Sequence, residues 1–285
     1  MKRSLAIAAL LLLTAAAPTS SEIEANAPPD AWVAIAPDDL ILFETSRGPF
    51  VMQLAPAFAP MHVALIKAAV RKGDFSGGAV VRVQDNYVVQ WAVAEDKTEP
   101  DAKVLPEFER PLAGLTITTF PWPDAYAEAW GFADGFPVAI DKKAKTAWLQ
   151  HCYGMVGVGR GNAPDSGNGT ELYAVIGHAP RHLDRNMASV GRIIAGLDKL
   201  SSLPRGTEAL GFYKTSGERL RIKGARMVSD MPAGEQLRFE MMKTTSPTFA
   251  AYANARANRS DAFFVRPAGA VDACNVRVPI RAAAQ

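Results

Sequence analysis

The chain has 285 residues, of which 48% are hydrophobic and 21% are charged, and its 31 basic and 29 acidic residues give a formal net charge of +2. This composition is that of an ordinary globular protein and excludes wholesale disorder. The balanced charge argues against a protein that binds nucleic acid or anionic membranes through a general basic face. Two cysteines are too few for a disulfide-dense scaffold or for a zinc site made of several thiolates.

The N-terminal segment has the pattern of a secretory signal peptide. A basic start, Met1-Lys2-Arg3, is followed by an apolar run over 5–17 that only Thr14 interrupts. The run is about 13 residues long, shorter than the roughly 20 that a helix needs to span a bilayer. We expect a signal peptide over 1–20, export to the bacterial periplasm, and no stable membrane insertion after cleavage. A buried helix or an uncleaved anchor is the alternative.

Export bears on the two cysteines, because disulfides persist in oxidising compartments. Cys152 and Cys274 allow one intramolecular pairing, which would tie the C-terminal tail to the middle of the chain. Closing so long a loop adds about 4–5 kcal/mol of stability in the chain-entropy model. Two unpaired buried thiols are the alternative.

In chain order, ordered structure is expected to begin after a linker. Residues 21–38 are rich in alanine, proline, serine and acidic residues, which is typical of a linker. Two apolar stretches, 40–44 and 50–54, flank a glycine-containing turn and predict a β-hairpin. The apolar positions of 61–72 fall on one helical face, so a helix is expected there.

The rest of the chain holds short β-rich runs and a few helical patterns. Strands are expected at 79–83, 87–91, 172–176, 219–228 and 275–278. Helices are expected at 193–200 and, broken at Pro247, at 236–259, while the proline-punctuated 95–150 predicts long loops and insertions on a β scaffold. Mostly strands with widely spaced helices favour a closed β-barrel with helices covering its ends over an alternating β/α sheet.

The sequence lacks the motifs of several common binding and catalytic sites. The glycine-rich run 157–161 lacks the spacing of a dinucleotide fingerprint and the Lys-Ser/Thr ending of a phosphate loop. The sequence contains no Gly-x-Ser-x-Gly of a serine hydrolase. The four histidines do not have zinc-protease spacing, so we expect no metal site and no cofactor.

One constellation of polar residues remains. Arg82 lies in an apolar β run, and Tyr87 and Gln90 follow five and eight residues later across a turn. On a half-buried sheet, an arginine flanked by valines faces either solvent or a pocket. A solvated strand arginine is the alternative to a functional one.

At this point the sequence resembles a known family, the cyclophilin-type peptidyl-prolyl cis-trans isomerases. Short segments between about 40 and 228 resemble the family's motifs in the right order: Thr45-Ser46-Arg47-Gly48 with 51–56, Asp74-Phe75 with Gly78, Val81-Arg82-Val83, 87–90, Gly159-Arg160, 164–166, 169–173, Leu183-Asp184, Val190-Gly191-Arg192 and Gly196-Leu197-Asp198. The resemblance implies a mainly β fold: a closed eight-stranded barrel over 39–230, capped by two helices. The partly helical extension, 231–285, is expected to pack on the barrel.

The resemblance also implies the roles of individual residues. Arg82 would be the catalytic residue. The substrate-binding residues would be Tyr87, Val88, Gln90, Val158, Glu171, Tyr173, His182, Leu183 and Met187. Four positions depart from the family's usual pattern: Glu171 stands for a glutamine, His182 for an aromatic residue, Met187 for a histidine and Val190 for a phenylalanine. These departures bear on rate and substrate preference more than on fold.

Rotation about an X-Pro bond needs no nucleophile, metal or proton shuttle, only stabilisation of the twisted amide, which a guanidinium can supply. The sequence therefore predicts an exported prolyl isomerase whose partners are proline-containing polypeptides that are folding. Two other functions remain open: a weakly catalytic proline-binding module or chaperone, and a docking protein that acts through 231–285. The oligomeric state is left open.

Overall fold

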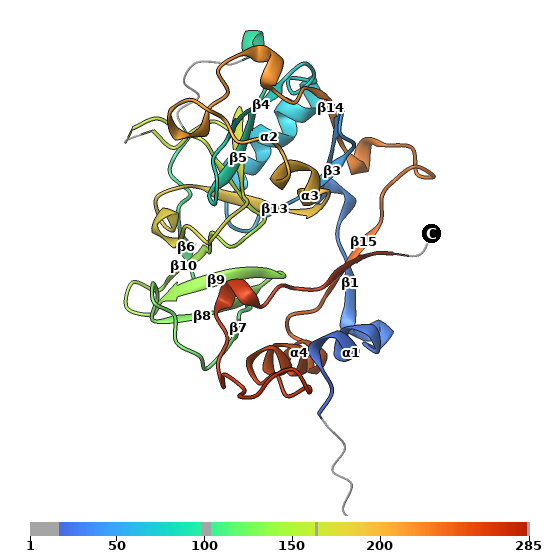
Figure 1. The fold of residues 1–285 in the computed structure, drawn as a ribbon, viewed down its shortest axis with the longest axis vertical. Helices are drawn as coiled ribbons and strands as arrows, with labels where there is room; N and C mark the ends of the chain where they lie inside the picture. Colours follow the sequence, from blue (N-terminus) through green and yellow to red (C-terminus); the bar gives the residue numbers. More distant parts are fainter. Residues whose placement is uncertain (1–16, 98–103, 163–164, 284–285) are drawn as a thin grey trace, which may run out of the picture.

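Eight antiparallel strands form the main sheet of the chain, which the computed structural model describes over residues 17–97, 104–162 and 165–283 (Figure 1). In their order across the sheet they are β14 (Ile222–Met227), β2 (Leu40–Thr45), β3 (Phe50–Leu54), β13 (Ser189–Ala195), β11 (Met155–Val158), β12 (Glu171–Val175), β5 (Val88–Ala92) and β4 (Ala79–Val83). The backbone N–H of Val80 donates to Leu220 (2.9 Å) and that of Ile222 to Gly78 (2.8 Å), so the two edges meet. The sheet is a nearly closed barrel.

The barrel interior is filled by one apolar cluster. Phe43 and Phe50 stack with ring centroids 4.7 Å apart, and Trp91 lies edge-on to Phe50 at 5.5 Å. Two helices, α2 (Pro60–Lys72) and α3 (Leu197–Ser201), cover the barrel and contribute their buried apolar residues to this cluster. The predicted fold, a mainly β barrel of eight strands capped by two helices, is confirmed.

Helix α2 has clear local causes for its ends. Pro60 occupies the first helical turn, where its missing N–H leaves no partner unsatisfied. Gly73 ends the helix in the left-handed region at φ +78°, which suits glycine. Arg71 and Lys72 in the last turn complement the negative end of the helix dipole. The predicted helix over 61–72 is therefore found within one residue of its expected start.

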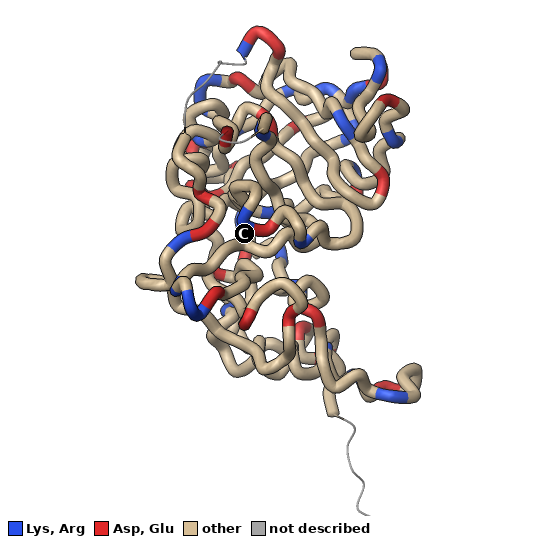
Figure 2. The backbone as a smooth tube through the Cα atoms, turned by 90° about the vertical axis from the view of Figure 1, so that its left-hand side faces the viewer, with Lys and Arg blue, Asp and Glu red and all other residues tan. Residues whose placement is uncertain are grey.

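Below the barrel in Figure 1, a smaller lobe is built from three separate parts of the chain. Its five-stranded sheet has the order β6 (Arg110–Pro111), β10 (Thr146–Leu149), β9 (Phe136–Asp141), β8 (Ala129–Ala133) and β7 (Thr118–Thr119). A three-stranded sheet has the order β1 (Trp32–Ala34), β15 (Phe239–Met242) and β16 (Ile280–Ala282), and the helices α1 (Ser20–Ala25) and α4 (Pro247–Ala257) pack together. Figure 2 shows the same lobe from the side, beneath the barrel.

Residues 95–150 are more ordered than the loops and insertions expected from the sequence. They contain the five-stranded sheet, in which Trp130 and Phe132 are fully buried. Strands β8 and β9 are joined at Asp134 and Gly135, which have φ values of +49° and +78°. Two successive positive φ values are what a two-residue hairpin turn of type I′ requires.

The first segment after the N-terminus is structured too. Residues 21–38, expected to be a linker, include most of α1, the short strand β1 and two 3₁₀ turns, η1 (Pro29–Ala31) and η2 (Pro37–Asp39). Strand β1 pairs with β15 from the C-terminal extension, which explains the order. The extension packs on the barrel through Phe239 and Ile280 and on the five-stranded sheet through α4.

Three expected elements differ from those found. Residues 193–195 belong to strand β13, because they pair with β3 and the helix α3 starts only after Gly196, whose φ is +78°. The expected helical segment 236–259 is a strand, β15, followed by α4, whose first residue is Pro247 and whose N-cap is Ser246. The last strand, expected at 275–278, is β16 (Ile280–Ala282), since residues 273–275 form the 3₁₀ turn η8.

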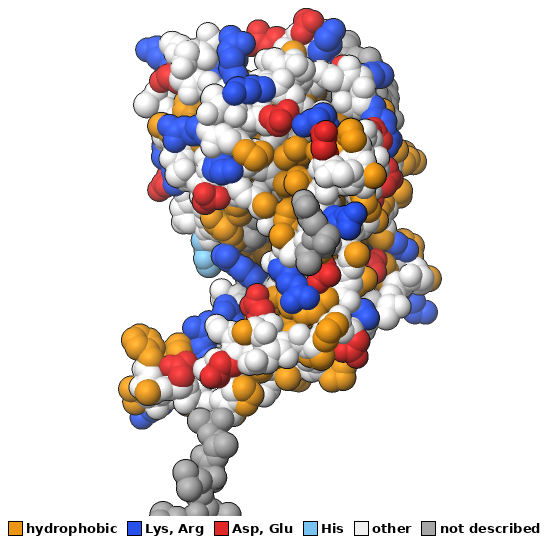
Figure 3. Space-filling view, turned by 90° about the vertical axis from the view of Figure 1, so that its right-hand side faces the viewer, with side chains coloured by type: hydrophobic (Ala, Val, Ile, Leu, Met, Phe, Trp, Pro, Cys, Tyr) orange, Lys and Arg blue, Asp and Glu red, His pale blue; other side chains and the backbone are white. Residues whose placement is uncertain are grey.

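The predicted signal peptide, 1–20, lies mostly outside the described residues, which begin at 17. In the described part of the chain, no helix is both long enough and apolar enough to cross a membrane. Basic and acidic residues are interspersed along the backbone tube in Figure 2, and their side chains are interspersed over the face shown in Figure 3. This mixing agrees with the near-zero formal charge.

Candidate functional site

Arg82 is presented by an irregularity in the pairing of β4 with β5. The register shifts between Val80 and Arg82, so Val80 and Val83 both enter the barrel core while Arg82 pairs with Gln90 on β5. Such a bulge re-aims side chains on the bulged strand. It places Arg82 outside the barrel core, beside Gln90.

Arg82 is half-buried, and hydrogen bonds and two aromatic rings hold its guanidinium. Its Nε donates to the carbonyl oxygen of Leu210 (2.6 Å), Nη1 donates to Oε1 of Gln90 (3.3 Å), and Nη2 donates to Oε1 of Gln84. Its central carbon lies 5.5 Å from the ring centroid of Tyr87 and 5.4 Å from that of Phe212. The guanidinium therefore does not point into bulk water, as a solvated strand arginine would.

A second hydrogen bond orients Gln90 toward Arg82. Nε2 of Gln90 donates to Oε2 of Glu171 (2.8 Å), and a carboxylate can only accept. The amide nitrogen must therefore face Glu171, which leaves Oε1 toward Arg82. Burial lowers the pKa of the Arg82 guanidinium from its ordinary value, while Tyr87 and Glu171 act to raise it. An arginine so placed stays cationic at neutral pH.

Six of the nine residues predicted to bind substrate come from three segments, 87–88, β12 and 182–187. Tyr87 lies in the turn before β5, Val88 and Tyr173 lie on β5 and β12, and His182 and Leu183 lie on the 3₁₀ helix η4 (Arg181–Leu183). We call the set Tyr87, Val88, Tyr173, His182, Leu183 and Met187 the candidate pocket.

Contacts and pairing place several members of this set near Arg82. The rings of Tyr87 and His182 stack with centroids 6.1 Å apart and 8° between their planes. Tyr173 pairs with Gln90 across β12 and β5. Met187 donates its backbone N–H to Leu183 (3.2 Å), which holds these two on one turn.

Val158 is the exception among the predicted binding residues. It is fully buried and belongs to the apolar cluster of the barrel interior. The reason is the alternation of β11, in which Val156 and Val158 both face the core. Val158 therefore supports the site from within the barrel and is left out of the candidate pocket.

An open groove of about 720 Å³ lies next to Arg82 along β4. Its lining includes Glu171 and Phe212, the residues that contact Gln90 and Arg82. Arg219 and Glu95, which form an ion pair at 3.0 Å, lie at the same groove. The groove therefore opens to solvent beside the residues that hold the Arg82 guanidinium and the Gln90 amide.

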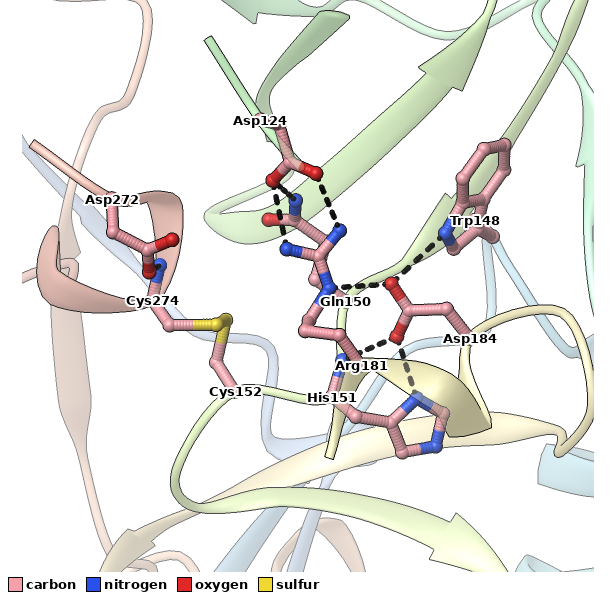
Figure 4. Close-up of a disulfide and its surroundings, with 9 residues drawn as sticks. All are labelled: Asp124, Trp148, Gln150, His151, Cys152, Arg181, Asp184, Asp272 and Cys274. Carbon is pink, nitrogen blue, oxygen red and sulfur yellow. Dashed lines mark hydrogen bonds and ion pairs between the residues drawn. A yellow bond between two sulfur atoms is a disulfide. The ribbon is translucent and has the colours of Figure 1, made fainter. Parts of the chain in front are cut away.

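Sequence reasoning missed a buried polar network behind Tyr173. His151 bonds to Tyr173. Figure 4 shows that His151 and Arg181 both bond to Asp184 and that Arg181 also bonds to Asp124. Arg181 and Asp184, three positions apart, were a signal for this network in the sequence, but Asp124, the second partner of Arg181, is distant in sequence. Within the described ranges, no group of three or more His, Cys, Asp or Glu side chains is arranged to hold a metal ion.

The predicted disulfide is confirmed. Cys152 and Cys274 are bonded, with their Cα atoms 4.9 Å apart (Figure 4). Cys152 directly follows His151 and precedes the barrel strand β11, which begins at Met155, and Cys274 lies in η8 of the extension. The bond therefore fastens the C-terminal extension beside the polar network.

Comparisons with known proteins agree with this geometry. The family model "Cyclophilin type peptidyl-prolyl cis-trans isomerase/CLD" matches residues 40–225, from the first barrel strand to the last. A protein of Brucella suis named as a probable peptidyl-prolyl cis-trans isomerase is 23% identical over 176 residues, which cover 62% of this chain and 76% of the relative. The Arabidopsis thaliana peptidyl-prolyl cis-trans isomerase CYP23 is 27% identical over 187 residues, 64% of this chain and 68% of the relative.

A solved structure extends the similarity beyond the barrel. The cyclophilin AquaCyp293 from Hirschia baltica superposes with a TM-score of 0.71 at 27% identity, covering 93% of this chain and 97% of that protein. Because the barrel alone is a smaller share of the chain, the match includes much of the smaller lobe.

Proposed function

The chain belongs to the family of cyclophilin-type peptidyl-prolyl cis-trans isomerases, and from this premise we propose that Arg82 is its catalytic residue and that the candidate pocket holds the substrate proline. The position of the guanidinium carries the proposal: it is half-buried, bonded to Gln90, and flanked by Tyr87 and Phe212. The proposal assigns Gln90 and Glu171 the task of orienting it.

Isomerisation of an X-Pro bond requires only that the protein lower a rotational barrier. Rotation about a peptide bond faces a barrier of about 18–20 kcal/mol because the nitrogen shares its lone pair with the carbonyl. For X-Pro bonds the two isomers are close in energy, but exchange takes tens to hundreds of seconds. A catalyst therefore has to stabilise only the twisted amide, in which the lone pair is localised on the proline nitrogen.

A guanidinium suits that task. Being permanently charged, it can donate to the localised lone pair or to the neighbouring carbonyl oxygen. At a half-buried side chain such a bond is stronger than in water. The candidate pocket would hold the ring while the preceding residue rotates, and the groove beside Glu171 and Phe212 would take the flanking peptide. No proton is transferred, so Met187 in place of a histidine is compatible with activity.

We propose further that the clients are proteins that fold after export to the periplasm. Two observations support this: the basic and apolar start of the sequence, and the disulfide Cys152–Cys274, a bond typical of oxidising compartments. Cell fractionation with sequencing of the mature N-terminus tests it. Recovery of the uncleaved chain from the cytoplasm would contradict it.

The decisive experiment measures both turnover and binding on the purified mature chain. The cis-to-trans rate of an X-Pro peptide is followed in a protease-coupled assay, and the affinity for the same peptide is measured by titration. Catalysed exchange supports the proposal. Peptide binding without accelerated exchange would instead indicate a proline-binding module or chaperone.

A further inference from the structure

A buried chain of polar side chains runs from the back of the candidate pocket toward the smaller lobe. Nε2 of His151 lies 2.9 Å from the hydroxyl oxygen of Tyr173, and Nδ1 lies 3.0 Å from Oδ1 of Asp184. The His151 and Tyr173 rings also stack, with centroids 6.1 Å apart. His151, Tyr173 and Asp184 are only 1%, 3% and 8% exposed.

The hydrogen bonds around Asp184 show which groups of this polar network donate and which accept. Its Oδ1 accepts the backbone and ring N–H groups of His151, and its Oδ2 accepts from Nε of Arg181 (2.6 Å) and from the indole of Trp148 (3.2 Å). Burial acts to raise the pKa of Asp184, but the His151 bond and the Arg181 charge outweigh it and lower the pKa. Asp184 is therefore an ionised acceptor.

An ionised Asp184 fixes the roles of the two ring nitrogens. Because the carboxylate only accepts, Nδ1 of His151 is the donor, and in the neutral ring Nε2 accepts from the Tyr173 hydroxyl. Burial raises the pKa of Tyr173 well above its ordinary value, so the hydroxyl keeps its proton. Tyr173 is thus held by a directional bond in addition to packing.

The same network reaches the pocket by a second route. Nη1 and Nη2 of Arg181 donate to the two carboxylate oxygens of Asp124, at 2.8 and 3.1 Å. Arg181 begins η4, whose next residues are His182 and Leu183 of the candidate pocket. Asp124 lies between β7 and β8, in the smaller lobe, and Figure 4 shows its carboxylate facing the guanidinium. One network therefore holds both Tyr173 and η4.

We propose that His151, Asp184, Arg181 and Asp124 are positioning residues of the isomerase site, through which the smaller lobe sets the geometry of the proline pocket. This inference rests on the function proposed above. It assigns the smaller lobe, through Asp124, a role in substrate binding that the family resemblance does not give it. The four residues act through Tyr173 and η4 and do not touch the substrate themselves.

The kinetic signature of this role differs from that of lost stability. A pocket that anchors the proline ring binds ground state and transition state alike, so loosening it raises KM with little change in kcat. Partial unfolding lowers the active fraction instead, which lowers apparent kcat and leaves KM unchanged. The split between KM and kcat therefore separates positioning from structure.

The test compares three variants of the full mature chain. His151→Asn keeps a donor near the Nδ1 position toward Asp184 but loses the acceptor for Tyr173, and Tyr173→Phe removes only the hydroxyl. Asp124→Asn removes the charge that holds Arg181 from the smaller lobe. Each is expected to raise KM for an X-Pro peptide about fivefold, with kcat within about twofold of the parent.

Two controls make the result specific. His62 is 0% exposed and its Nδ1 also meets a carboxylate, that of Glu107 at 2.6 Å, so His62→Asn is a matched change at a buried histidine outside the network. It is expected to lower stability and keep the parent KM. The double variant of His151→Asn and Tyr173→Phe is expected to match the larger single effect, because both changes break the same bond.

Three results would overturn the inference. The first is a KM equal to that of the parent in both His151→Asn and Tyr173→Phe, and the second is an equal rise in KM in the control His62→Asn. The third is additive effects on KM in the double variant. Failure of the inference is distinguishable from failure of the proposed function. If the parent chain does not catalyse exchange, the function fails, while the affinity of each variant for the proline peptide, measured by titration, still tests the positioning role.

Discussion

The Nε–H of Arg82 donates to the carbonyl oxygen of Leu210 across 2.6 Å, although 128 positions separate the two residues in the sequence. Leu210 has a φ of +59°, in the left-handed region that favours glycine. The backbone of a distant loop, held in an uncommon conformation, thus fixes one edge of the guanidinium. The other edge of the guanidinium faces Gln90, which pairs with Arg82 across β4 and β5. The two contacts together fix the orientation of the guanidinium.

Replacing Arg82 with alanine is expected to lower kcat for an X-Pro peptide at least about tenfold, a loss of about 1.4 kcal/mol of transition-state stabilisation. The reason is that the variant lacks the guanidinium proposed to stabilise the twisted amide. The measurement is the protease-coupled rate at saturating peptide, with circular dichroism to show that the barrel remains folded. A folded variant as fast as the parent would remove Arg82 from its proposed role.

Arg82→Lys is a useful companion change. It keeps the charge but loses the planar fork that bonds Leu210 and Gln90 at once. We expect kcat to fall between those of the parent and Arg82→Ala.

The role of Glu171 can be divided into hydrogen bonding and charge. Glu171→Gln keeps an acceptor for Nε2 of Gln90, so kcat/KM is expected to stay within about threefold of the parent. Glu171→Leu leaves that amide without its partner and removes the carboxylate that acts on Arg82. It is expected to lower kcat/KM more than the glutamine variant does. Equal activity of the leucine variant and the parent would show that the orientation of Gln90 does not matter.

The barrel was predictable because its strands and its helix α2 have recognisable local sequence patterns. The apolar stretches 40–44 and 50–54 lie in the buried strands β2 and β3, and α2 begins at the expected proline, Pro60. The smaller lobe was not recognised, because its three-stranded sheet joins segments far apart in sequence, such as β1 with β15. The strands of its five-stranded sheet were missed because the prolines in 95–150 favoured loops. One local signal was present, since Asp134-Gly135 between apolar runs is a strong hairpin pattern.

The candidate site divides in the same way. Arg82 and Gln90 lie on the two strands of one hairpin and Tyr87 lies in its turn, so their proximity followed from the sequence. Val158 did not follow, because the face on which a strand residue lies changes with a shift of one position. The contacts of Arg82 with Leu210 and of Arg181 with Asp124 join residues far apart in the chain, and no sequence pattern identifies such partners.

The disulfide is expected to contribute strongly to stability. It closes a loop with a sequence separation of 122, and removing it should lower the free energy of unfolding by about 4 kcal/mol in the chain-entropy model. The measurement is denaturant unfolding of the parent and of a variant with both Cys152→Ala and Cys274→Ala. Reductant should destabilise the parent and leave the variant unchanged. A parent that reacts with a thiol reagent under non-reducing, unfolding conditions would show that the bond is absent.

The pH dependence of stability should report on Asp184. Its pKa is lowered in the folded chain, so its ionised form stabilises the fold at pH values above the unfolded pKa of about 3.9. That contribution is lost as the pH falls through the lower, folded pKa. Asp184→Asn lacks the titration, and at pH 7 it is expected to cost about 3 kcal/mol because Arg181 and His151 lose their anionic partner.

The variant should therefore lose less stability than the parent between pH 7 and pH values near 3. Denaturant unfolding at both pH values measures the difference. Asp96→Asn, at a side chain that is 74% exposed, serves as the control and should follow the parent at both values. If Asp184→Asn and the parent lost equal stability on acidification, the carboxylate would not be the ionised acceptor on which the bonds of His151 and Arg181 depend.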